Sequence, residues 1–235
     1  MPETERNSET LVQGEPGAET RRIKVWDGAT RLFHWLLVFL LGFSWLSAKK
    51  GWITLHLYGG CTIGALILFR VAWGFVGSET ARFSQFMASP FEAVRHLLHL
   101  TKREPDEQVG HNAAGGWMVL ILLTIVAVQV MSGLMANDDI AFEGPLVQFI
   151  SKELSDKLTW LHFRLFTVIQ IAAAAHVLAI VAYLVVKRHN LLPAMLHGHK
   201  RLPFDTEAPH IAHPLRAWAI FLVAAALMAW VAVWL

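Results

Sequence analysis

Long apolar stretches alternate with short polar segments along most of this chain. Five of the stretches approach or exceed the roughly 20 residues that a helix needs to cross the hydrocarbon core of a bilayer. They span residues 32–48, 52–77, 109–137, 165–186 and 217–235. Tryptophans stand near many of their ends, where interfacial anchors are expected. The pattern predicts an all-α integral membrane protein with five transmembrane helices.

The polar segments predict the remaining organisation. Residues 1–25 are rich in Glu, Thr and Arg and lack the apolar core of a signal peptide, so we expect a disordered cytoplasmic tail. A membrane core follows over residues 26–188, then a cytoplasmic loop over 189–213 and the fifth transmembrane helix over 214–235. Within the core, the sequence SPFE at residues 89–92 has an N-cap serine and a proline in the first helical position, which predicts a short interfacial helix reaching residue 100.

The distribution of Lys and Arg predicts the orientation. A cytoplasmic N-terminus places 15 of the 20 Lys and Arg residues on the cytoplasmic side and 5 on the other side, as the positive-inside rule requires. We therefore expect a multi-pass membrane protein with a cytoplasmic N-terminus and a C-terminus on the opposite, outer side. The acidic segment 138–156 then lies on the outer side and is a candidate docking surface for a basic partner.

Composition narrows the cofactor chemistry. The chain is 55% hydrophobic, and we expect membrane lipid, but no nucleic acid, among its partners. Its single cysteine, Cys61, excludes an intrachain disulfide, a cysteine-ligated cluster and a CxxCH haem attachment site. Any haem must therefore be held without thioether bonds, as haem b is.

Four histidines lie within apolar stretches or at their ends: His34, His56, His162 and His176. Ionisable side chains are costly in hydrocarbon and are functional by default. His162 and His176 are fourteen residues apart on one predicted helix, which places them about 21 Å apart on nearly the same face. Matching by depth pairs His56 with His162 near the outer surface and His34 with His176 further in. Two facing imidazoles can hold one haem iron axially, so the sequence predicts two haem groups suited to electron transfer.

Two further residues are candidates at the inner end. His111 begins the third stretch, and it is an alternative ligand of the inner haem, part of a quinone pocket, or a polar residue at a helix start. Arg31 precedes His34 by three residues, so it lies on the same helix face and could pair with a haem propionate or a lipid phosphate. A single membrane histidine is as well explained by a hydrogen bond to a neighbouring helix. Four histidines in two depth-matched pairs favour the haem interpretation.

An ordered set of short motifs resembles the bacterial cytochrome b561 family, which includes the b-type cytochrome subunits of nickel–iron hydrogenases. The resemblance covers roughly residues 25 to 200. The matching residues are Trp26-Asp27, Arg31-Leu32-Phe33-His34-Trp35, His56, Gly60, Arg70-Val71-Ala72-Trp73-Gly74-Phe75, Gly110-His111-Asn112, Gly115-Gly116-Trp117, Asp138-Asp139-Ile140, Glu143-Gly144-Pro145, His162, His176, Tyr183 and Lys187-Arg188-His189-Asn190-Leu191.

The resemblance implies a bundle of four transmembrane helices that binds two haem b groups, with ligands from the first, second and fourth helices, and that exchanges electrons with membrane quinone. The fifth, C-terminal transmembrane helix lies outside this shared core. The resemblance also implies the bacterial cytoplasmic (inner) membrane, so that the C-terminus is periplasmic. Electron partners in the family include hydrogenases, soluble c-type cytochromes and superoxide. We therefore expect the electron-transfer subunit of an oxidoreductase, which relays electrons between a periplasmic redox protein, such as a hydrogenase or c-type cytochrome, and quinone. The alternatives are a self-contained quinone oxidoreductase that acts on a small oxidant such as superoxide, and a non-redox membrane anchor subunit.

Overall fold

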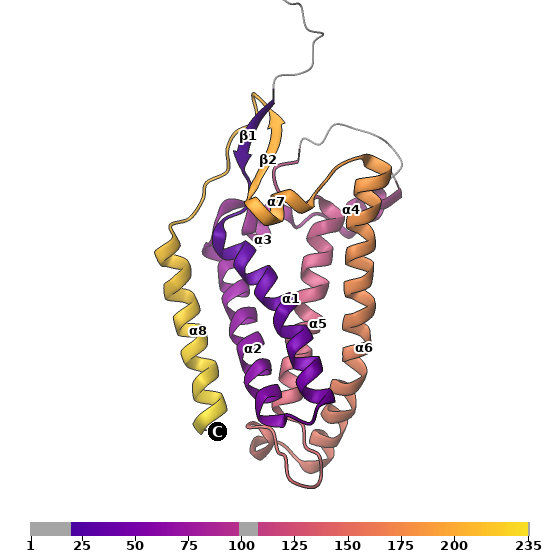
Figure 1. Ribbon diagram of the computed structural model, residues 1–235, viewed down its shortest axis with the longest axis vertical. Coiled ribbons are helices and arrows are strands. Elements are labelled where there is room, and N and C mark those ends of the chain that lie inside the picture. The colour runs from indigo at the N-terminus through magenta and orange to yellow at the C-terminus, as the bar shows by residue number, and fades with distance from the viewer. Residues whose placement is uncertain (1–19, 99–107, 235) are drawn as a thin grey trace, which may run out of the picture.

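Five long helices run side by side and form the body of the molecule (Figure 1). The computed structural model describes residues 20–98 and 108–234. The long helices are α1 (Gly28–Lys49), α2 (Ile53–Val76), α5 (Ala113–Leu134), α6 (Lys152–Ala182) and α8 (Pro214–Trp234). Each has the length and apolar composition of a membrane span. The predicted all-α fold class with five candidate membrane spans is confirmed.

Helix α2 lies at the centre of the packing. It contacts α1, α5 and α8, and α5 in turn packs against α6. Accordingly, α2 is the most buried of the five spans. Neither α1 nor α2 packs closely against α6. Helix α6, which carries two of the four histidines, is therefore attached to the bundle mainly through α5.

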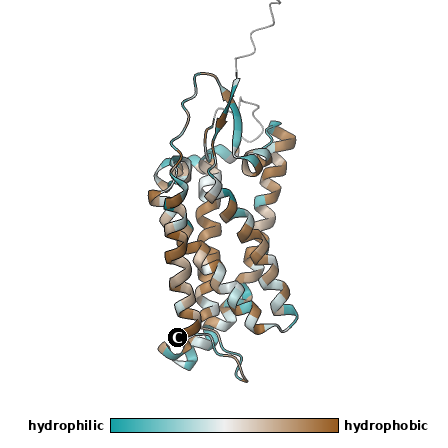
Figure 2. Ribbon diagram, turned by 60° about the vertical axis from the view of Figure 1, so that its left-hand side comes forward, coloured by the Kyte–Doolittle hydropathy of each residue, from teal (hydrophilic) through white to brown (hydrophobic). Residues whose placement is uncertain are grey.

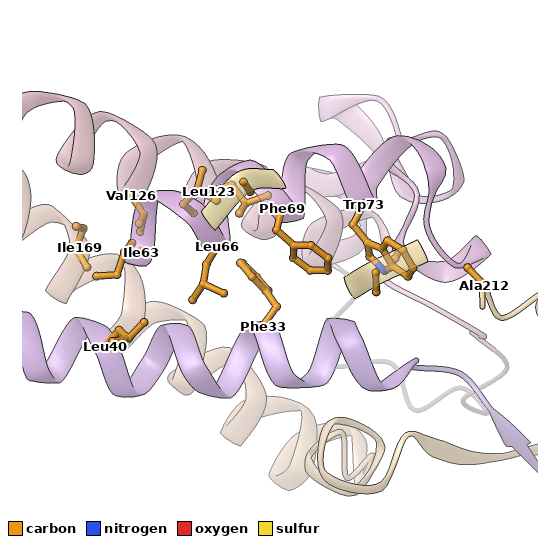
Figure 3. Packing of buried hydrophobic residues seen from close by; sticks show 14 residues of the cluster. Phe33, Leu40, Ile63, Leu66, Phe69, Trp73, Leu123, Val126, Ile169 and Ala212 are labelled. Carbon is orange, nitrogen blue, oxygen red and sulfur yellow. The ribbon is translucent and has the colours of Figure 1, made fainter. Parts of the chain in front are cut away.

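A single apolar cluster joins the spans. Phe33 and Leu40 of α1 point toward α2, where Leu66 and Phe69 meet them, and Ile169 of α6 reaches the same cluster (Figure 3). Lipid tails are as apolar as these side chains, so close packing rather than exclusion of water holds such helices together. Figure 2 shows the predominantly hydrophobic colouring of the spans that results.

Helix α8 packs closely against α2 at Gly64. A β-carbon at Gly64 would lie 2.7 Å from the methyl carbon of Met228 and 3.2 Å from a methyl carbon of Val130. The missing side chain therefore lets α8 approach α2 closely. The fifth span covers the face of α2 that points away from α6.

The two ends of the bundle differ, and we name them after the predicted topology. The outer end carries the turn between α1 and α2 and the connection from α5 to α6, which contains the 3-10 helix η2 (Val147–Phe149). The inner end carries every other connection. It includes the 3-10 helix η1 (Glu79–Ala81), α3 (Phe83–Phe86), α4 (Pro90–Leu98), the π-helix η3 (Tyr183–Lys187) and α7 (Leu192–His197).

Helix α4 is the short helix that the SPFE sequence predicts. The Ser89 hydroxyl accepts a hydrogen bond from the Glu92 N–H, and the Glu92 carboxylate accepts one from the Ser89 N–H. This reciprocal pair is a capping box. Phe91, 83% exposed, stands in the first turn and gives α4 an apolar face for a membrane surface. The predicted end at residue 100 lies outside the described residues.

A two-stranded sheet corrects the prediction for the N-terminal tail. Strand β1 (Thr20–Lys24) pairs antiparallel with β2 (His199–Pro203), which is distant in the sequence. The strand pair projects beyond the inner end (Figure 1). Ile23 and Val25 are buried against the inner end. Residues 20–25 are therefore ordered, because the loop after α6 supplies a strand partner that the local sequence does not reveal. Residues 1–19 lie outside the described residues.

Helix α6 also differs from its predicted bounds. It begins at Lys152 rather than near residue 165. Ser151 caps it by accepting a hydrogen bond from the Leu154 N–H. The first turns of α6 are polar, so the apolar pattern of the sequence indicated only the later part of the helix. His162 consequently lies well inside the helix, and the acidic segment 138–156 is partly helical.

Candidate functional site

The four histidines form two pairs at different depths. The imidazole centroids of His56 and His162 are 6.0 Å apart, and those of His34 and His176 are 6.4 Å apart. His162 and His176 both belong to α6, about 21 Å apart along the helix axis. The structure thus brings together the same pairs that depth matching predicts. Ligation of a haem by these pairs stays a prediction.

The space between the paired rings fits an axially ligated iron. A histidine nitrogen binds a first-row metal at about 2 Å, so two axial nitrogens lie about 4 Å apart, with both rings behind them. Centroid separations of 6.0 and 6.4 Å leave that room. Among the described residues, no group of three or more His, Cys, Asp or Glu side chains could hold a bare metal ion. Paired histidines suit a metal that arrives with its equatorial ligands, as haem iron does.

The placement of the rings follows from the helix packing. His34 and His56 come from α1 and α2, and both partners come from α6, the helix that neither α1 nor α2 contacts closely. The imidazoles therefore face one another across the loosest interface of the bundle. A flat macrocycle requires such an interface, because close helix packing would exclude it.

Both histidines of the outer pair are held by backbone carbonyl groups of a neighbouring helix. The Nδ1 atom of His56 lies 2.9 Å from the Ser44 carbonyl oxygen, and the Nδ1 atom of His162 lies 2.9 Å from the Gln129 carbonyl oxygen. A carbonyl only accepts, so each ring donates from Nδ1 and keeps an unprotonated Nε2. Such hydrogen bonds fix the tautomer and orientation of ligand histidines.

Two glycines make room for this outer arrangement. A β-carbon at Gly133 of α5 would lie 2.7 Å from Cε1 of the His162 ring. A β-carbon at Gly59 of α2 would lie 2.7 Å from the hydroxyl oxygen of Ser44. Each glycine thus stands where a histidine-bearing helix meets its neighbour. Gly133 was not among the residues that the sequence singled out.

The inner pair is oriented differently. The Nδ1 atom of His34 is buried without a hydrogen-bond partner, and His176 makes no hydrogen bond within the described part of the chain. The His34 ring packs edge-on against Trp35, with centroids 4.8 Å apart. Packing rather than hydrogen bonding therefore sets the orientation of the inner rings.

An apolar residue separates the two levels. Ile169 lies two turns of α6 from each histidine of that helix, and it is only 4% exposed. It contacts the cluster formed with Leu40, Ile63 and Val126 of the other spans (Figure 3). Water is excluded from the middle of the bundle at this level.

A lid covers the inner pair. Nη1 of Arg31 donates to the Leu196 carbonyl at 2.6 Å, and the Trp35 indole donates to the Met195 carbonyl at 3.3 Å. Helix α7 is thereby fastened to α1 beside His34. The Nε atom of Arg31 also donates a hydrogen bond, to the Asp27 carbonyl at 3.4 Å. Two nitrogen atoms of this guanidinium therefore bind backbone carbonyl groups. Its pairing with a haem propionate stays a prediction.

His111 is enclosed at the inner end by two aromatic rings. Its centroid is 4.6 Å from the Trp26 ring and 4.8 Å from the Phe86 ring, and its Nδ1 atom is buried without a hydrogen-bond partner. Burial, together with smaller contributions from the nearby Arg70 and His176, lowers the pKa of His111 to about 3. The imidazole is therefore neutral at physiological pH. The structure shows no pairing of the His111 ring with His34 or His176.

Arg70 is a residue whose importance the sequence understated. Snorkelling to lipid headgroups is the usual behaviour of an arginine near a helix end, yet Arg70 is only 2% exposed. Its guanidinium lies 5.2 Å from the Phe83 ring centroid, and its Nη1 atom is buried without a hydrogen-bond partner. A buried donor without an acceptor is costly, which marks Arg70 as a candidate partner for an anionic or carbonyl group.

A cavity of about 730 Å³ adjoins His111. It lies between α3, α4 and the start of α5, and its lining includes Gln85, Phe86, Met87 and His96. The hydroxyl of Tyr183 is 2.6 Å from Nε2 of His96 and accepts a hydrogen bond from the Asn112 amide at 2.6 Å. Apolar and hydrogen-bonding side chains thus line one cavity at the inner end of the bundle.

The acidic outer segment is largely engaged with itself. Asp139 and Asp156 form ion pairs with Lys152, and Glu153 forms one with Lys157. The Asp138 carboxylate accepts hydrogen bonds from the backbone N–H groups of Phe142, Ile140 and Ala141, which lowers the pKa of that carboxyl. The ion pairs with Lys152 and Lys157 thus offset part of the negative charge of this segment locally, while the Asp138 carboxylate stays ionised.

Comparison with known proteins supports a single family. Residues 25–198 match the family model of the prokaryotic cytochrome b561. This stretch contains all four histidines, Arg31, Arg70 and His111, and it ends before α8. No curated protein and no solved structure matches the chain significantly.

Proposed function

Because the chain belongs to the prokaryotic cytochrome b561 family, we propose that it is a di-haem b-type cytochrome that relays electrons between a periplasmic redox partner and membrane quinone. Membership itself implies a membrane b-type cytochrome in electron transfer. The number of haem groups, their ligands, the quinone and the orientation belong to the proposal.

The two depth-separated histidine pairs carry the proposal. His56 and His162 hold the outer haem b, and His34 and His176 hold the inner haem b. Each haem supplies a one-electron carrier when bound, and two axial histidines leave no position for a substrate on the iron. The unprotonated Nε2 atoms of His56 and His162 suit a metal ligand, and the carbonyl groups behind them resist rotation of the rings.

The inner end supplies the charge that haem propionates require. Arg31 lies on the helix of His34, Arg70 acts electrostatically on His111 at the same end, and Arg70 has a buried donor without a partner. Arg–carboxylate hydrogen bonds are among the stronger polar contacts. We assign Arg70 as well as Arg31 to propionate binding.

The cavity beside His111 is the proposed site of quinone exchange. Phe86 and Met87 offer apolar contacts for a quinone ring, and His111 and His96 offer hydrogen-bonding atoms for its carbonyl oxygens. The cavity lies at the inner end of the bundle, beside His111. Helices α4 and α7 shield this end of the bundle, while the outer end is left for a protein partner.

The orientation follows from charge. The inner end collects most of the Lys and Arg residues of the described chain, including those of the β1–β2 pair. The positive-inside rule then assigns this end to the cytoplasm of a bacterium. The C-terminal end of α8 and the segment from Asp138 face the periplasm.

Spectroscopy on the purified protein tests the proposal. We expect two haem b groups per chain in a reduced-minus-oxidised spectrum with haem quantitation, and reduction of both by a short-chain quinol. Protein that contains haem b but is not reduced by any quinol would contradict the relay function. Protein without haem would contradict the histidine assignment.

A variant at the cavity tests the quinone site separately. We expect His111→Phe to retain both haem groups but to slow their reduction by quinol about tenfold or more, because a hydrogen-bonding atom of the site is lost. The matched control is His213→Phe, an exposed inner-end histidine outside the cavity. Equal rates in the wild type and His111→Phe would remove quinone from this cavity.

A further inference from the structure

The β1–β2 pair places two arginines directly opposite one another. Arg22 faces Arg201, and Lys24 faces His199 beside them in the antiparallel register. All four side chains lie on one face of the pair, because neighbouring residues of a strand alternate between faces. Directly opposed like charges destabilise an antiparallel pair. This face is therefore suited to an anion that neutralises the opposed charges.

A cavity of about 530 Å³ borders that face. Arg22 and Arg201 line it together with Arg188 and Lys200, and no carboxylate of the described residues is part of the lining. Within the described chain, the guanidinium groups of the three arginines have no hydrogen-bond or ion-pair partner. Three strong donors thus converge on one hollow without an acceptor.

The backbone at the end of α6 brings one of these donors into place. Arg188 has a φ of 58°, in the left-handed region that non-glycine residues rarely adopt. The chain reverses here from the π-helix η3 toward α7. An arginine held in an unfavourable backbone conformation beside two other unpartnered arginines indicates a binding role for the group.

The surroundings of the cavity favour a lipid over a soluble anion. Leu192 and Leu196 of α7 are about half exposed. The same helix contributes Pro193 and His197 to the cavity lining. Figure 1 shows α7 between the strand pair and the ends of the spans, and Figure 2 shows predominantly hydrophobic colouring along those spans. Exposed leucines beside a basic cavity match the acyl and phosphate parts of one molecule.

We propose that this cavity binds the phosphate group of an anionic phospholipid from the inner leaflet. The lipid neutralises the Arg22–Arg201 opposition and fastens the strand pair and α7 to the bundle. Arg188 contributes the third guanidinium from the opposite wall. The cavity contains neither the paired histidines nor the residues assigned to quinone, so the proposal does not depend on the redox function.

Lipid counting on the intact, haem-loaded protein tests this site. The protein in neutral detergent is titrated with phosphatidylglycerol, with phosphatidylcholine and with inorganic phosphate, and retained lipid per chain is counted by native mass spectrometry. We expect one phosphatidylglycerol to be retained preferentially and to raise the melting temperature. Arg22→Gln/Arg201→Gln should weaken its retention about tenfold or more, because two charges at the phosphate are lost.

Charge-matched controls separate a site from a general attraction. Lys49→Gln/Lys50→Gln removes the same charge from exposed positions at the outer end, and Arg21→Gln removes one charge from the other face of β1. Both should retain the lipid. Arg188→Gln, which lies outside the strands, should lose it even if the double variant folds poorly.

Three results would overturn the proposal. The first is equal lipid retention in the wild type and both cavity variants. The second is an equal loss in the Lys49→Gln/Lys50→Gln control. The third is stabilisation by inorganic phosphate alone, with no preference for phosphatidylglycerol, which would assign the cavity to a soluble anion.

Discussion

The two histidine pairs have nearly the same ring separation but are built in different ways. In the outer pair, His56 and His162 each donate from Nδ1 to a carbonyl group of a neighbouring helix. In the inner pair, the Nδ1 atom of His34 is buried without an acceptor, and Trp35 packs against its ring. The outer rings are thus oriented by hydrogen bonds within the bundle, whereas the inner rings depend on packing and on the lid that covers them.

This difference indicates how the two levels are specialised. Rings held by hydrogen bonds to backbone carbonyl groups bind a metal in one geometry. The inner level instead has a lid, two arginines and a cavity beside His111, which suit exchange with a mobile partner. We therefore expect the outer haem to be the more tightly held of the two, and the inner haem to be the more sensitive to its surroundings.

Removal of an outer ligand should have the largest effect. His162→Ala deletes a proposed iron ligand, so we expect the haem content to fall from two haem b groups to one per chain, measured by haem extraction and quantitation. His111→Ala is the matched control and should retain both, since the structure shows the His111 ring against Trp26 and Phe86 rather than against a paired histidine. Loss of a haem in His111→Ala would instead make His111 a ligand.

A single methyl group should disturb the outer level selectively. Gly133→Ala places a carbon 2.7 Å from the His162 ring, and overpacking of this kind costs about 1–3 kcal/mol. We expect faster transfer of the outer haem to apomyoglobin, with the inner haem unaffected. Gly28→Ala, where no atom lies within 4 Å of the new carbon, should behave as the wild type. Identical transfer rates in both variants would show that His162 is not confined by α5.

Release of the lid should act only on the inner level. Arg31→Gln/Trp35→Phe removes the two side-chain hydrogen bonds that fasten α7 to α1, worth about 1–3 kcal/mol together. Faster hydrogen exchange over residues 192–198 and a shifted inner-haem midpoint potential are expected. The outer haem serves as the internal control. A shift of both haem groups to the same extent would contradict a lid that is local to the inner pair.

The smallest effect should come from the residue between the levels. Ile169→Val removes one buried methylene group, which costs about 0.5–1.5 kcal/mol. Both haem groups should remain, while the melting temperature falls slightly. Val168→Ala is the control, because Val168 is exposed on the same helix. Loss of either haem in Ile169→Val would show that the two levels are not independently built.

The sequence was sufficient for the spans, the family and the depth of the histidines, because apolar length and Lys/Arg bias depend on local composition. It was insufficient for contacts that depend on two distant segments. Strand β1 forms only because residues 199–203 return to it, and Gly133 matters only because α5 meets α6 at His162. Burial of Arg70 similarly depends on Phe83 and on the residues around Asp27. The start of α6 was missed because its first turns are polar.

Haem quantitation in double variants tests the pairing of the histidines most directly. The matched double variants, His56→Ala/His162→Ala and His34→Ala/His176→Ala, each remove both proposed ligands of one haem and should retain one haem b per chain. The crossed double variants, His34→Ala/His162→Ala and His56→Ala/His176→Ala, remove one ligand from each haem and should retain none. Equal haem content in matched and crossed variants would contradict the assignment of one haem to each pair.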